Sequence, residues 1–532
     1  MTARRCPADS VTRACLMLVV VATIAFAALG LATRPAMYSD SSFGLAVWDS
    51  MKRGAGFNVL VYPDPADIAR DTSEFSTTWS PGQYLLPAAF ERLGFDLGTS
   101  LMVVVTLCSA IGLGAWYGLY RAVGFSPRTC AIALLVVTFN RAFSLPFGIY
   151  NGGEVLLFAV MPLGFLVAWR LRDLRWWSPL PLVLATAGLV FLKLSGVVYM
   201  AAAVSSAVLC SGPPWIGREI LRKAIVAGIT LAALALLLQW AWLSRGWNVL
   251  HAATQTDWPQ LWKILAFTVA SLWTSIFSFG SLLQYVFFFP GQALLPSDAA
   301  LNVLLVLPAL ATFAFVWRSL HHDHATYLRF VFGAVAAAAV FFVALWLHKG
   351  DVTMDERHFR SLSLLLLVGL VEACLVSSRR IVRAGFAGLA GLAALYGVAS
   401  CLQHARSNLK VPLGDRGVRL SNASAEVLAF VRQLDKAAAG DDGIMVYLSM
   451  PELTLEMPNT RSLTSHADFD PPEQLLTDVY RGRVKRLYVI LQKTLVANGK
   501  AEIILKSFVD YRDDDWQRSD LDRFVVFSSL SR

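Results

Sequence analysis

Long apolar runs separated by short polar segments fill the first three quarters of the chain. An α-helix needs about 20 residues to cross the apolar core of a bilayer, and about eleven of these runs reach or approach that length. They cover residues 14–33, 99–119, 129–146, 153–169, 178–192, 195–211, 224–243, 299–317, 327–347, 360–377 and 384–402. The pattern predicts an α-helical polytopic membrane protein with a long polar loop at residues 34–98 and a second long loop at residues 244–298.

The first long loop contains two stretches that predict shorter helices. Phe43, Val47 and Met51 recur at i, i+4 and i+8, which gives residues 41–52 one apolar face. A helix of this kind is expected to lie on the membrane surface. Residues 80–95 form an apolar helix of about 15 residues, so they are expected to insert into the membrane without crossing it fully.

Beyond residue 402 the apolar runs shorten and charged residues become more frequent. An amphipathic helix is predicted by the i, i+3, i+4, i+7 spacing of Val427, Phe430, Val431 and Leu434. Three short β-rich runs follow, at residues 444–448, 487–491 and 524–527. We therefore predict a transmembrane domain over residues 1–402 and a small soluble α/β domain over residues 403–532.

The composition agrees with a membrane protein. Of the 532 residues, 56% are hydrophobic and 16% are charged, whereas soluble domains carry about 25% charged residues. The mean hydropathy is +0.55. The net charge of +9 does not indicate nucleic-acid binding, because the positive residues cluster in short loops between apolar runs, where they set the membrane topology.

These positive residues also predict the orientation of the chain. Arg4, Arg5 and Arg13 precede the first apolar run, which we interpret as a retained first helix and not as a cleaved signal peptide. Positive residues favour the cytoplasmic side, so the N-terminus is expected in the cytoplasm. An odd number of crossings then places residues 403–532 outside.

Arg357 and Arg360, on the predicted outer face, are separated by three positions. On a helix they share a face and could clamp one anion. Arginine suits phosphate because its planar fork donates two parallel hydrogen bonds, and His358 could add a third donor. The alternative is that neighbouring acids such as Asp355 and Glu356 simply neutralise the two arginines.

Three more polar residues stand at the predicted outer ends of apolar runs. Asp40 closely follows the first run, and it is either a solvated loop residue or a base that faces a lipid-borne substrate. Glu154 begins another run, where the helix macrodipole would stabilise its charge without any role in a site. Lys193 lies at a turn between two runs, where extending the amine toward the interface is its ordinary alternative.

No metal motif is visible in the sequence, which has neither a CxxC nor an HExxH pattern. His321, His322 and His324 form a cluster in a predicted cytoplasmic loop, without a cysteine or a matched acidic partner. We interpret this cluster as part of a solvated loop.

The order of these features resembles the GT-C class of membrane glycosyltransferases, in particular its protein-mannosyltransferase-like and aminoarabinose-transferase-like bacterial branches. The resemblance rests on Asp40 just after the first span, on residues 77–86 (TTWSPGQYLL) and on residues 356–360 (ERHFR) before a late span. A C-terminal periplasmic domain also fits. The chain departs from the family where Ser41 follows Asp40 in place of the frequent glutamate, and where residues 79–82 replace a His-Pro-Pro-Leu-like stretch.

This resemblance implies a fold, a reaction and partners. The enzyme would move a sugar from a polyprenyl-phosphate carrier to a lipid, glycan or protein acceptor, among membrane lipids and without nucleic acid. It would act at the outer face of the bacterial inner membrane, with its C-terminal domain in the periplasm. No cofactor is identified, and dependence on a divalent metal varies within the class.

The resemblance also implies roles for single residues. Asp40 matches the catalytic acidic position, as the base that activates an acceptor hydroxyl. Arg357 and Arg360, with His358, would bind the donor phosphate and stabilise the charge that grows on it as it departs. Further candidates for the site are Glu154, Lys193 and Tyr84.

Two other functions compete with this reading. A ligase or polymerase of lipid-linked glycans also uses arginines of outer loops, but it does not require an acid directly after the first span. A transporter or flippase places its substrate near the bilayer midplane, commonly on broken helices in related halves. Here the polar residues gather at one predicted face and no repeated halves are evident, which favours the transferase.

Overall fold

The computed structural model describes most of the chain and divides it into two compact units. The described residues are 9–37, 39–211, 217–246, 256–281, 288–289, 292–293, 298–350, 352–441, 443–465, 467 and 472–530. The first unit consists of Met1–Leu29, Val105–Phe147 and Gly153–Gln403, and the second of Gly30–Val104, Gly148–Gly152 and His404–Arg532. The second unit thus combines the C-terminal residues with residues of the first long loop.

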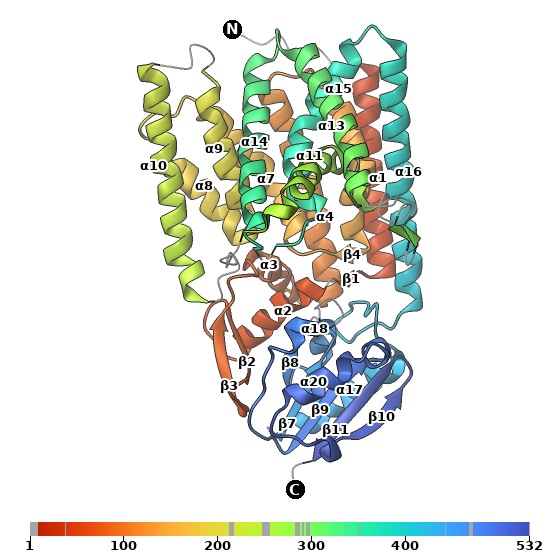
Figure 1. Ribbon diagram of the computed structural model, residues 1–532. Helices are drawn as coiled ribbons and strands as arrows, with labels where there is room; N and C mark the ends of the chain where they lie inside the picture. The colour runs from red at the N-terminus through yellow and green to blue at the C-terminus, as the bar shows by residue number, and fades with distance from the viewer. Residues whose placement is uncertain are drawn as a thin grey trace. The chain divides into compact units, whose positions relative to one another are not determined.

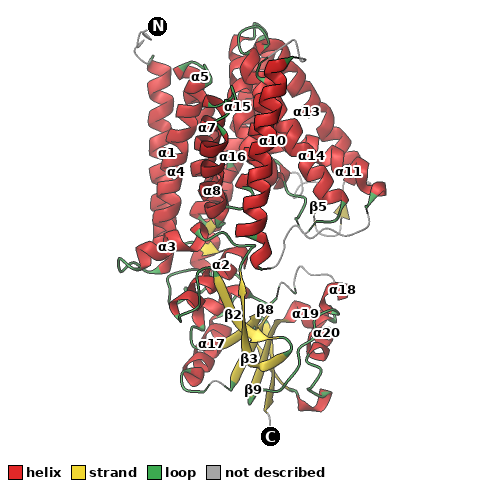
Figure 2. Ribbon diagram, turned by 90° about the vertical axis from the view of Figure 1, so that its left-hand side faces the viewer, coloured by secondary structure: helices red, strands yellow, loops and turns green. Residues whose placement is uncertain are grey.

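The first unit is a bundle of α-helices whose long members run side by side in both ribbon views (Figures 1 and 2). The helices are α1 (Ser10–Thr33), α4 (Leu97–Ala122), α5 (Pro127–Phe139), α6 (Arg141–Ser144), α7 (Gly153–Arg170), α8 (Pro179–Leu192), α9 (Gly196–Leu209), α10 (Arg218–Ala241), α11 (Leu261–Phe277), α13 (Asp298–Leu320), α14 (Ala325–Leu347), α15 (Arg360–Val376) and α16 (Arg380–Lys410). Short 3₁₀ turns are η1 (Leu145–Phe147), η2 (Leu243–Arg245), η3 (Trp258–Gln260) and η4 (Glu356–Phe359). Helices α1, α4 and α16 continue into residues of the second unit.

The bundle confirms the predicted fold class. By length and composition, 8 of the described helices can cross a membrane, or up to 9 if the bent pair Pro127–Phe139 and Arg141–Phe147 is one span. Shorter apolar helices lie at Pro179–Leu192, Gly196–Leu209 and Leu304–Leu320. Each predicted apolar run falls on one of these helices, so the chain is a polytopic α-helical membrane protein.

The prediction of a second long loop at residues 244–298 was wrong over residues 261–277, which form the apolar helix α11. Polar residues interrupt the apolar sequence of α11. Several of these are buried in the bundle. Ser275 Oγ lies 2.5 Å from Ser363 Oγ of α15, and the hydroxyl of Thr268 donates to Ile264 O within the helix at 2.8 Å.

Both ends of α11 lie at the same end of the bundle. Just before it, the N–H of Asp257 donates to the carbonyl oxygen of Leu347, the last residue of α14, at 2.8 Å. Just after it, the N–H of Gly280 donates to Glu356 Oε2 in η4 at 2.9 Å. The end of α14 and η4 are neighbours, since the rings of Trp346 and Phe359 have centroids 6.2 Å apart. The chain therefore enters and leaves α11 on the same side of the bundle, the side of η4.

Helix α15 is enclosed by the bundle, because its residues from Ser361 to Val371 are all buried. Tyr120 of α4 donates its hydroxyl to Leu364 O at 2.7 Å, and Tyr327 of α14 donates to Leu365 O at 2.8 Å. A Cβ at Gly369 would lie 2.6 Å from the hydroxyl of Tyr327, so only glycine allows this approach. These contacts hold α15 on two sides, and they fix the η4 turn at its start.

The C-terminal part of the second unit is a three-layer α/β sandwich. Its elements are α17 (Ala425–Ala438), β7 (Ile444–Leu448), η5 (Pro451–Glu456), β8 (Arg461–Thr464), α18 (Pro472–Leu475), β9 (Arg486–Gln492), α19 (Lys493–Ala497), α20 (Lys500–Ser507), η6 (Asp513–Asp515), β10 (Gln517–Leu521) and β11 (Phe524–Leu530). The sheet order is β10-β11-β9-β7-β8, with β7 parallel to both β8 and β9 (Figure 1). The predicted amphipathic helix and the three predicted strands are all present.

Alternation along the strands builds one core on each face of this sheet, since successive strand residues point to opposite sides. Val446 and Leu448 of β7 pack in a cluster with Val427 and Val431 of α17. Tyr447 of β7 packs in the opposite cluster, with residues of α19 and α20. The small α/β fold predicted for the C-terminal residues is therefore confirmed.

The first long loop supplies the remaining elements of the second unit. They are β1 (Ala36–Met37), α2 (Ser39–Lys52), β2 (Val59–Asp64), β3 (Asp67–Phe75) and α3 (Gly82–Glu91), and β1 pairs with β4 (Ile149–Tyr150). The helix predicted at residues 41–52 is present as α2, and it packs against β2, α3 and η5. Helix α3 has 10 residues, which is too few to cross a bilayer.

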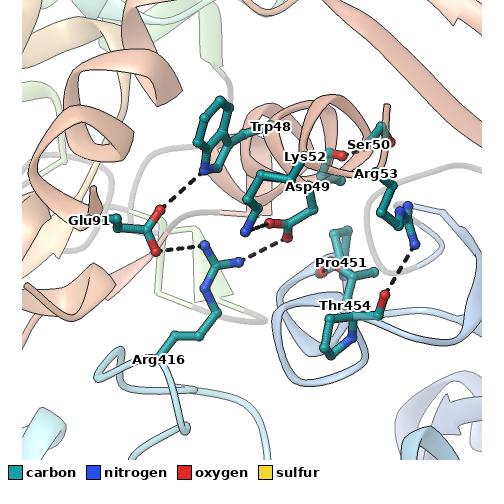
Figure 3. Close-up of polar contacts among 11 residues, drawn as sticks. Trp48, Asp49, Ser50, Lys52, Arg53, Glu91, Arg416, Pro451 and Thr454 are labelled. Carbon is teal, nitrogen blue, oxygen red and sulfur yellow. Dashed lines mark hydrogen bonds and ion pairs between the residues drawn. The ribbon is translucent and has the colours of Figure 1, made fainter. Parts of the chain in front are cut away.

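Arg416 joins α2 to α3 through two carboxylates (Figure 3). Its guanidinium lies 2.9 Å from Asp49 Oδ2 and 2.9 Å from Glu91 Oε1. Glu91 also accepts a hydrogen bond from the indole of Trp48 at 3.2 Å, and Lys52 forms a second ion pair with Asp49. Burial by itself lowers the pKa of Arg416, but the two carboxylates outweigh it and the pKa is raised.

Replacing Arg416 with alanine is expected to destabilise the second unit by about 3–5 kcal/mol, because Glu91 would keep its half-buried charge without a counter-charge. Thermal unfolding of the purified protein measures the effect. Arg53→Ala is the matched control, since Arg53 is exposed and donates to Pro458 O at 3.2 Å. Equal unfolding temperatures for the two variants would contradict the role of Arg416.

Candidate functional site

The chain that leads to Asp40 is held by a short parallel pairing in the second unit. Ala36 pairs with Ile149 and Met37 with Tyr150. The side-chain amide of Asn408 donates to Arg34 O at 2.9 Å and to Gly148 O at 2.8 Å, so one amide ties both segments. These contacts fix the backbone a few residues before Asp40.

Asp40 lies in the first turn of α2 and is half-buried. The free N–H groups of a helix start favour negative charge there. Next to it, the Ser41 hydroxyl donates to Tyr150 O at 3.4 Å. A Cβ at Gly152 would lie 2.7 Å from Gln83 Oε1 and 3.0 Å from Ser41 Oγ, and its φ is +59°. Only glycine suits this position. Its close approach brings the Ser41 hydroxyl and the Gln83 amide together beside the start of α2.

Tyr84 belongs to α3 in the same unit and is fully buried. Its hydroxyl donates to the side-chain oxygen of Asn58. Burial raises the pKa of Tyr84, so the phenol stays protonated. Its ring also lies against α2, because a Cβ at Gly44 would be 3.4 Å from Tyr84 Cδ1.

Glu154 and Lys193 form an ion pair in the first unit. Glu154 lies in the first turn of α7, and Lys193 directly follows α8. Lys193 Nζ is 2.7 Å from Glu154 Oε1, and the two side chains are only 22% and 10% exposed. Lys193 therefore pairs with a buried carboxylate in place of extending into the interface. The buried pair leaves no net charge of its own.

The two acids that directly precede Arg357 in the chain both have defined hydrogen-bond partners. Asp355 caps this turn, because its carboxylate accepts the Arg357 N–H at 2.8 Å, and its other oxygen lies 3.5 Å from Arg357 Nε. Glu356 accepts the N–H of Gly280. Neutralisation by Asp355 thus applies to Arg357, whereas Arg360 forms no ion pair with any carboxylate that the structure describes.

Arg360 begins α15, and it lies with Arg357 close enough to Glu154 to act on its charge. The Nε of Arg360 is buried and has no hydrogen-bond partner among the described residues. The same is true of His358 Nε2 and of Ser195 Oγ, which lies two positions after Lys193. An anion is the natural acceptor for such donors.

The ring of His358 is held by aromatic neighbours. Its centroid lies 5.4 Å from the centroid of the Phe342 ring and 6.4 Å from that of the Trp346 ring. Tyr199 of α9 donates its hydroxyl to His358 O at 2.8 Å. Sequence reasoning missed Tyr199 and Ser195, although each is a hydroxyl residue in or beside an apolar run near Lys193.

An apolar pocket of about 190 Å³ opens between α8, α9 and α10. Val190 and Phe191 of α8 line it just before Lys193 in the chain, and Val197 lines it just after Ser195. Leu234, Leu238 and Trp242 complete the wall on the α10 side. The pocket suits a hydrocarbon chain, because its lining offers almost no polar group.

Of the predicted site residues, the structure brings Glu154, Lys193, Arg357, Arg360 and His358 together in the first unit. Asp40 lies in the second unit, at the start of α2. Tyr84 lies in α3 of the same unit, with its ring against α2. Among the described residues, no group of three His, Cys, Asp or Glu side chains could hold a metal ion.

The fold is shared with solved membrane proteins. ArnT from Cupriavidus metallidurans bound to undecaprenyl phosphate is 12% identical with a TM-score of 0.50, over 97% of this chain and 98% of that chain. The same protein in the apo state is 12% identical with a TM-score of 0.50, over 96% and 97%. The arabinofuranosyltransferase AftD from Mycobacteria is 14% identical with a TM-score of 0.49, over 97% of this chain and 40% of that chain. No family model and no curated protein matches the sequence.

The similarity to ArnT defines a class of fold. The chain is a polytopic membrane protein with the GT-C fold, and the likeness to ArnT extends over nearly its whole length, the C-terminal domain included. The GT-C resemblance seen in the sequence is confirmed at the level of the fold.

Proposed function

We propose that this protein is a glycosyltransferase that moves a sugar from a polyprenyl-phosphate carrier to an acceptor at the outer face of the bacterial inner membrane. The observation that carries the proposal is the buried cluster around η4. Donors of Arg360 and His358 that have no partner among the described residues lie beside an already neutral Lys193–Glu154 pair. Such a cluster offers the charge of Arg360 and hydrogen-bond donors to a phosphate group.

Two further observations support a lipid-linked donor. Residues that flank Lys193 and Ser195 in the sequence line the apolar pocket between α8, α9 and α10. An isoprenoid tail could lie in this pocket. ArnT, which has the same fold, was solved with undecaprenyl phosphate bound. A phosphate at η4 and a hydrocarbon chain in the pocket would together recognise a polyprenyl phosphate.

In this proposal the residues divide the chemistry between them. Asp40 accepts the proton of the acceptor hydroxyl as that oxygen attacks the sugar. The bond between the sugar and the phosphate oxygen breaks, and Arg357 and Arg360 stabilise the charge left on the phosphate. Glu154 and Lys193 keep the arginines and the turn in place.

The direct test is a transfer assay with the purified full-length protein. The protein is incubated with polyprenyl phosphates that carry radiolabelled sugars, in membranes of the native host, and the labelled product is identified. Label that moves to a lipid, glycan or protein acceptor supports the proposal. Label that remains on the carrier but crosses the bilayer would point to a flippase instead.

The proposal also requires the η4 end of the bundle to face outward. The opposite ends of the helices carry basic residues, which favour the cytoplasm. They include Arg121, Arg128, Arg170, Arg172, Arg175, Arg218, Arg222, Arg318, Arg379 and Arg380. Because both ends of α11 lie on one side of the bundle, this helix adds no crossing to the odd number predicted from the sequence.

We expect a reporter enzyme that is active only in the periplasm to be active when it is fused after Lys410. The same reporter fused after Arg175, in the basic turn between α7 and α8, is the matched control and should be silent. The reverse pattern would place η4 in the cytoplasm, and a sugar donor on the outer face could then not be the substrate.

A further inference from the structure

A sharp break interrupts the apolar segment formed by α5 and α6. The two helices meet at Asn140 with a bend of 63°. The side-chain oxygen of Asn140 accepts the N–H of Ala142 at 2.8 Å, and its amide donates to Ile276 O of α11 at 2.8 Å. Non-helical backbone at membrane depth is tolerated where it is buried in protein or lines a cavity. The hydrogen bonds of Asn140 therefore stabilise the break within the bundle.

Helix α16 approaches the break at Gly397. A Cβ at this position would lie 2.1 Å from the carbonyl oxygen of Phe139, so no other residue allows the contact. The Ser144 hydroxyl donates to Gly397 O at 3.0 Å on the far side of the break. This close approach brings Tyr396 and Ser400 of α16 next to Arg141.

Arg141 is a half-buried cation in this apolar surrounding. Its Nε donates to Ser400 Oγ at 3.1 Å and its Nη1 to Ser281 Oγ at 3.0 Å. Its guanidinium lies over the ring of Tyr396, 5.8 Å from the centroid. No carboxylate of the described residues forms an ion pair with it. Among the described residues these partners are thus two hydroxyls and a ring, none of which carries a negative charge.

Arg141 does not serve membrane orientation. Helix α5 starts beside the basic residues Arg121 and Arg128, so the break lies toward the opposite end of the bundle, where positive charge is disfavoured. A charged residue inside a membrane segment is costly and marks a functional site by default. Arginine presents a fork that matches a phosphate group, and serine hydroxyls can turn to donate to the same oxygens.

We propose that Arg141, Ser281 and Ser400 form an anion-binding site that takes the phosphate group of a membrane lipid, separate from the cluster at η4. The short segment after α11 connects the two places, because Gly280 donates to Glu356 of η4 while the adjacent Ser281 accepts from Arg141. A lipid phosphate is favoured over a soluble anion because apolar helices surround the site. The inference stands on these contacts and does not depend on the transferase reaction.

The test is a lipid titration of the purified full-length protein in dodecyl maltoside micelles. Dioleoyl phosphatidate is added, and the rise in thermal unfolding temperature and the bound lipid by native mass spectrometry are measured. We expect Arg141→Gln to weaken phosphatidate binding about tenfold, since a charge-assisted hydrogen bond is lost. Arg141→Lys should recover part of the affinity, because it keeps the charge without the fork.

The matched control is Arg383→Gln, which removes one exposed positive charge from the start of α16. It should leave phosphatidate binding unchanged. Ser400→Ala offers a milder second variant and should weaken binding without loss of the folded state. Equal binding by Arg141→Gln and Arg383→Gln would overturn the site. Stabilisation of the wild type by inorganic phosphate as strong as by phosphatidate at equal concentration would overturn the lipid assignment.

Discussion

Asp40→Asn is expected to bind the donor normally and to transfer the sugar about a hundred- to ten-thousand-fold more slowly than the wild type. Asparagine keeps the size of the side chain and its capacity to accept a hydrogen bond at the start of α2. It cannot accept a proton from the acceptor hydroxyl. The effect is therefore expected in the turnover number and not in the Michaelis constant for the donor.

The structural setting of Asp40 makes this substitution informative. The backbone before it is tied by β1, β4 and Asn408, so the exchange of one oxygen for an amide should leave the helix start unchanged. Asp514→Asn is the matched control, because Asp514 is an exposed acid in η6 of the same unit. Transfer by Asp40→Asn at the rate of this control would show that Asp40 only caps α2. Glu154 would then be the next candidate for the base.

The second large effect is expected from the arginines of η4 and α15. Arg360→Ala should lower the affinity for a polyprenyl-phosphate donor about ten- to hundredfold, since each hydrogen bond to a charged group contributes about 1.5–3 kcal/mol. Arg357→Lys should also weaken binding, because lysine keeps the charge but cannot make paired hydrogen bonds to one phosphate. Binding is measured directly with the labelled donor, in parallel with turnover.

Arg379→Ala provides the control for these variants, because Arg379 is exposed and precedes α16 at the opposite end of α15. Its donor affinity should equal that of the wild type. Unchanged affinity and turnover in both Arg357→Lys and Arg360→Ala would leave the arginines a structural role only. The lipid-phosphate donor would then lose its main support.

Local patterns in the sequence were enough to predict the fold class. Apolar runs of membrane length determine α-helices, because every backbone polar group in a bilayer must be paired within its own segment. The predicted strands at 444–448, 487–491 and 524–527 became β7, β9 and β11, since their β-favouring residues fit a pleated, buried sheet. The i, i+3 spacing likewise put Arg357 and Arg360 on consecutive turns.

Helix α11 shows where pattern reasoning fails. Its serines and threonines interrupt an apolar sequence, yet they are buried and form hydrogen bonds within the bundle. A helix enclosed by other helices can carry such residues, because neighbouring helices and its own carbonyls supply the hydrogen bonds. Periodicity within the segment does not reveal those neighbours.

What the sequence by itself determined about this protein is its membrane class, the position of most helices and the existence of a C-terminal α/β domain. Only the tertiary structure decided which polar residues meet. Glu154 and Lys193 are 39 positions apart, and Arg141 finds Ser281 and Ser400 at separations of 140 and 259. Local periodicity records which face of a helix is apolar. The partner of a buried charge depends on which helices pack together, and that is settled by the close fit of side chains and glycines such as Gly397.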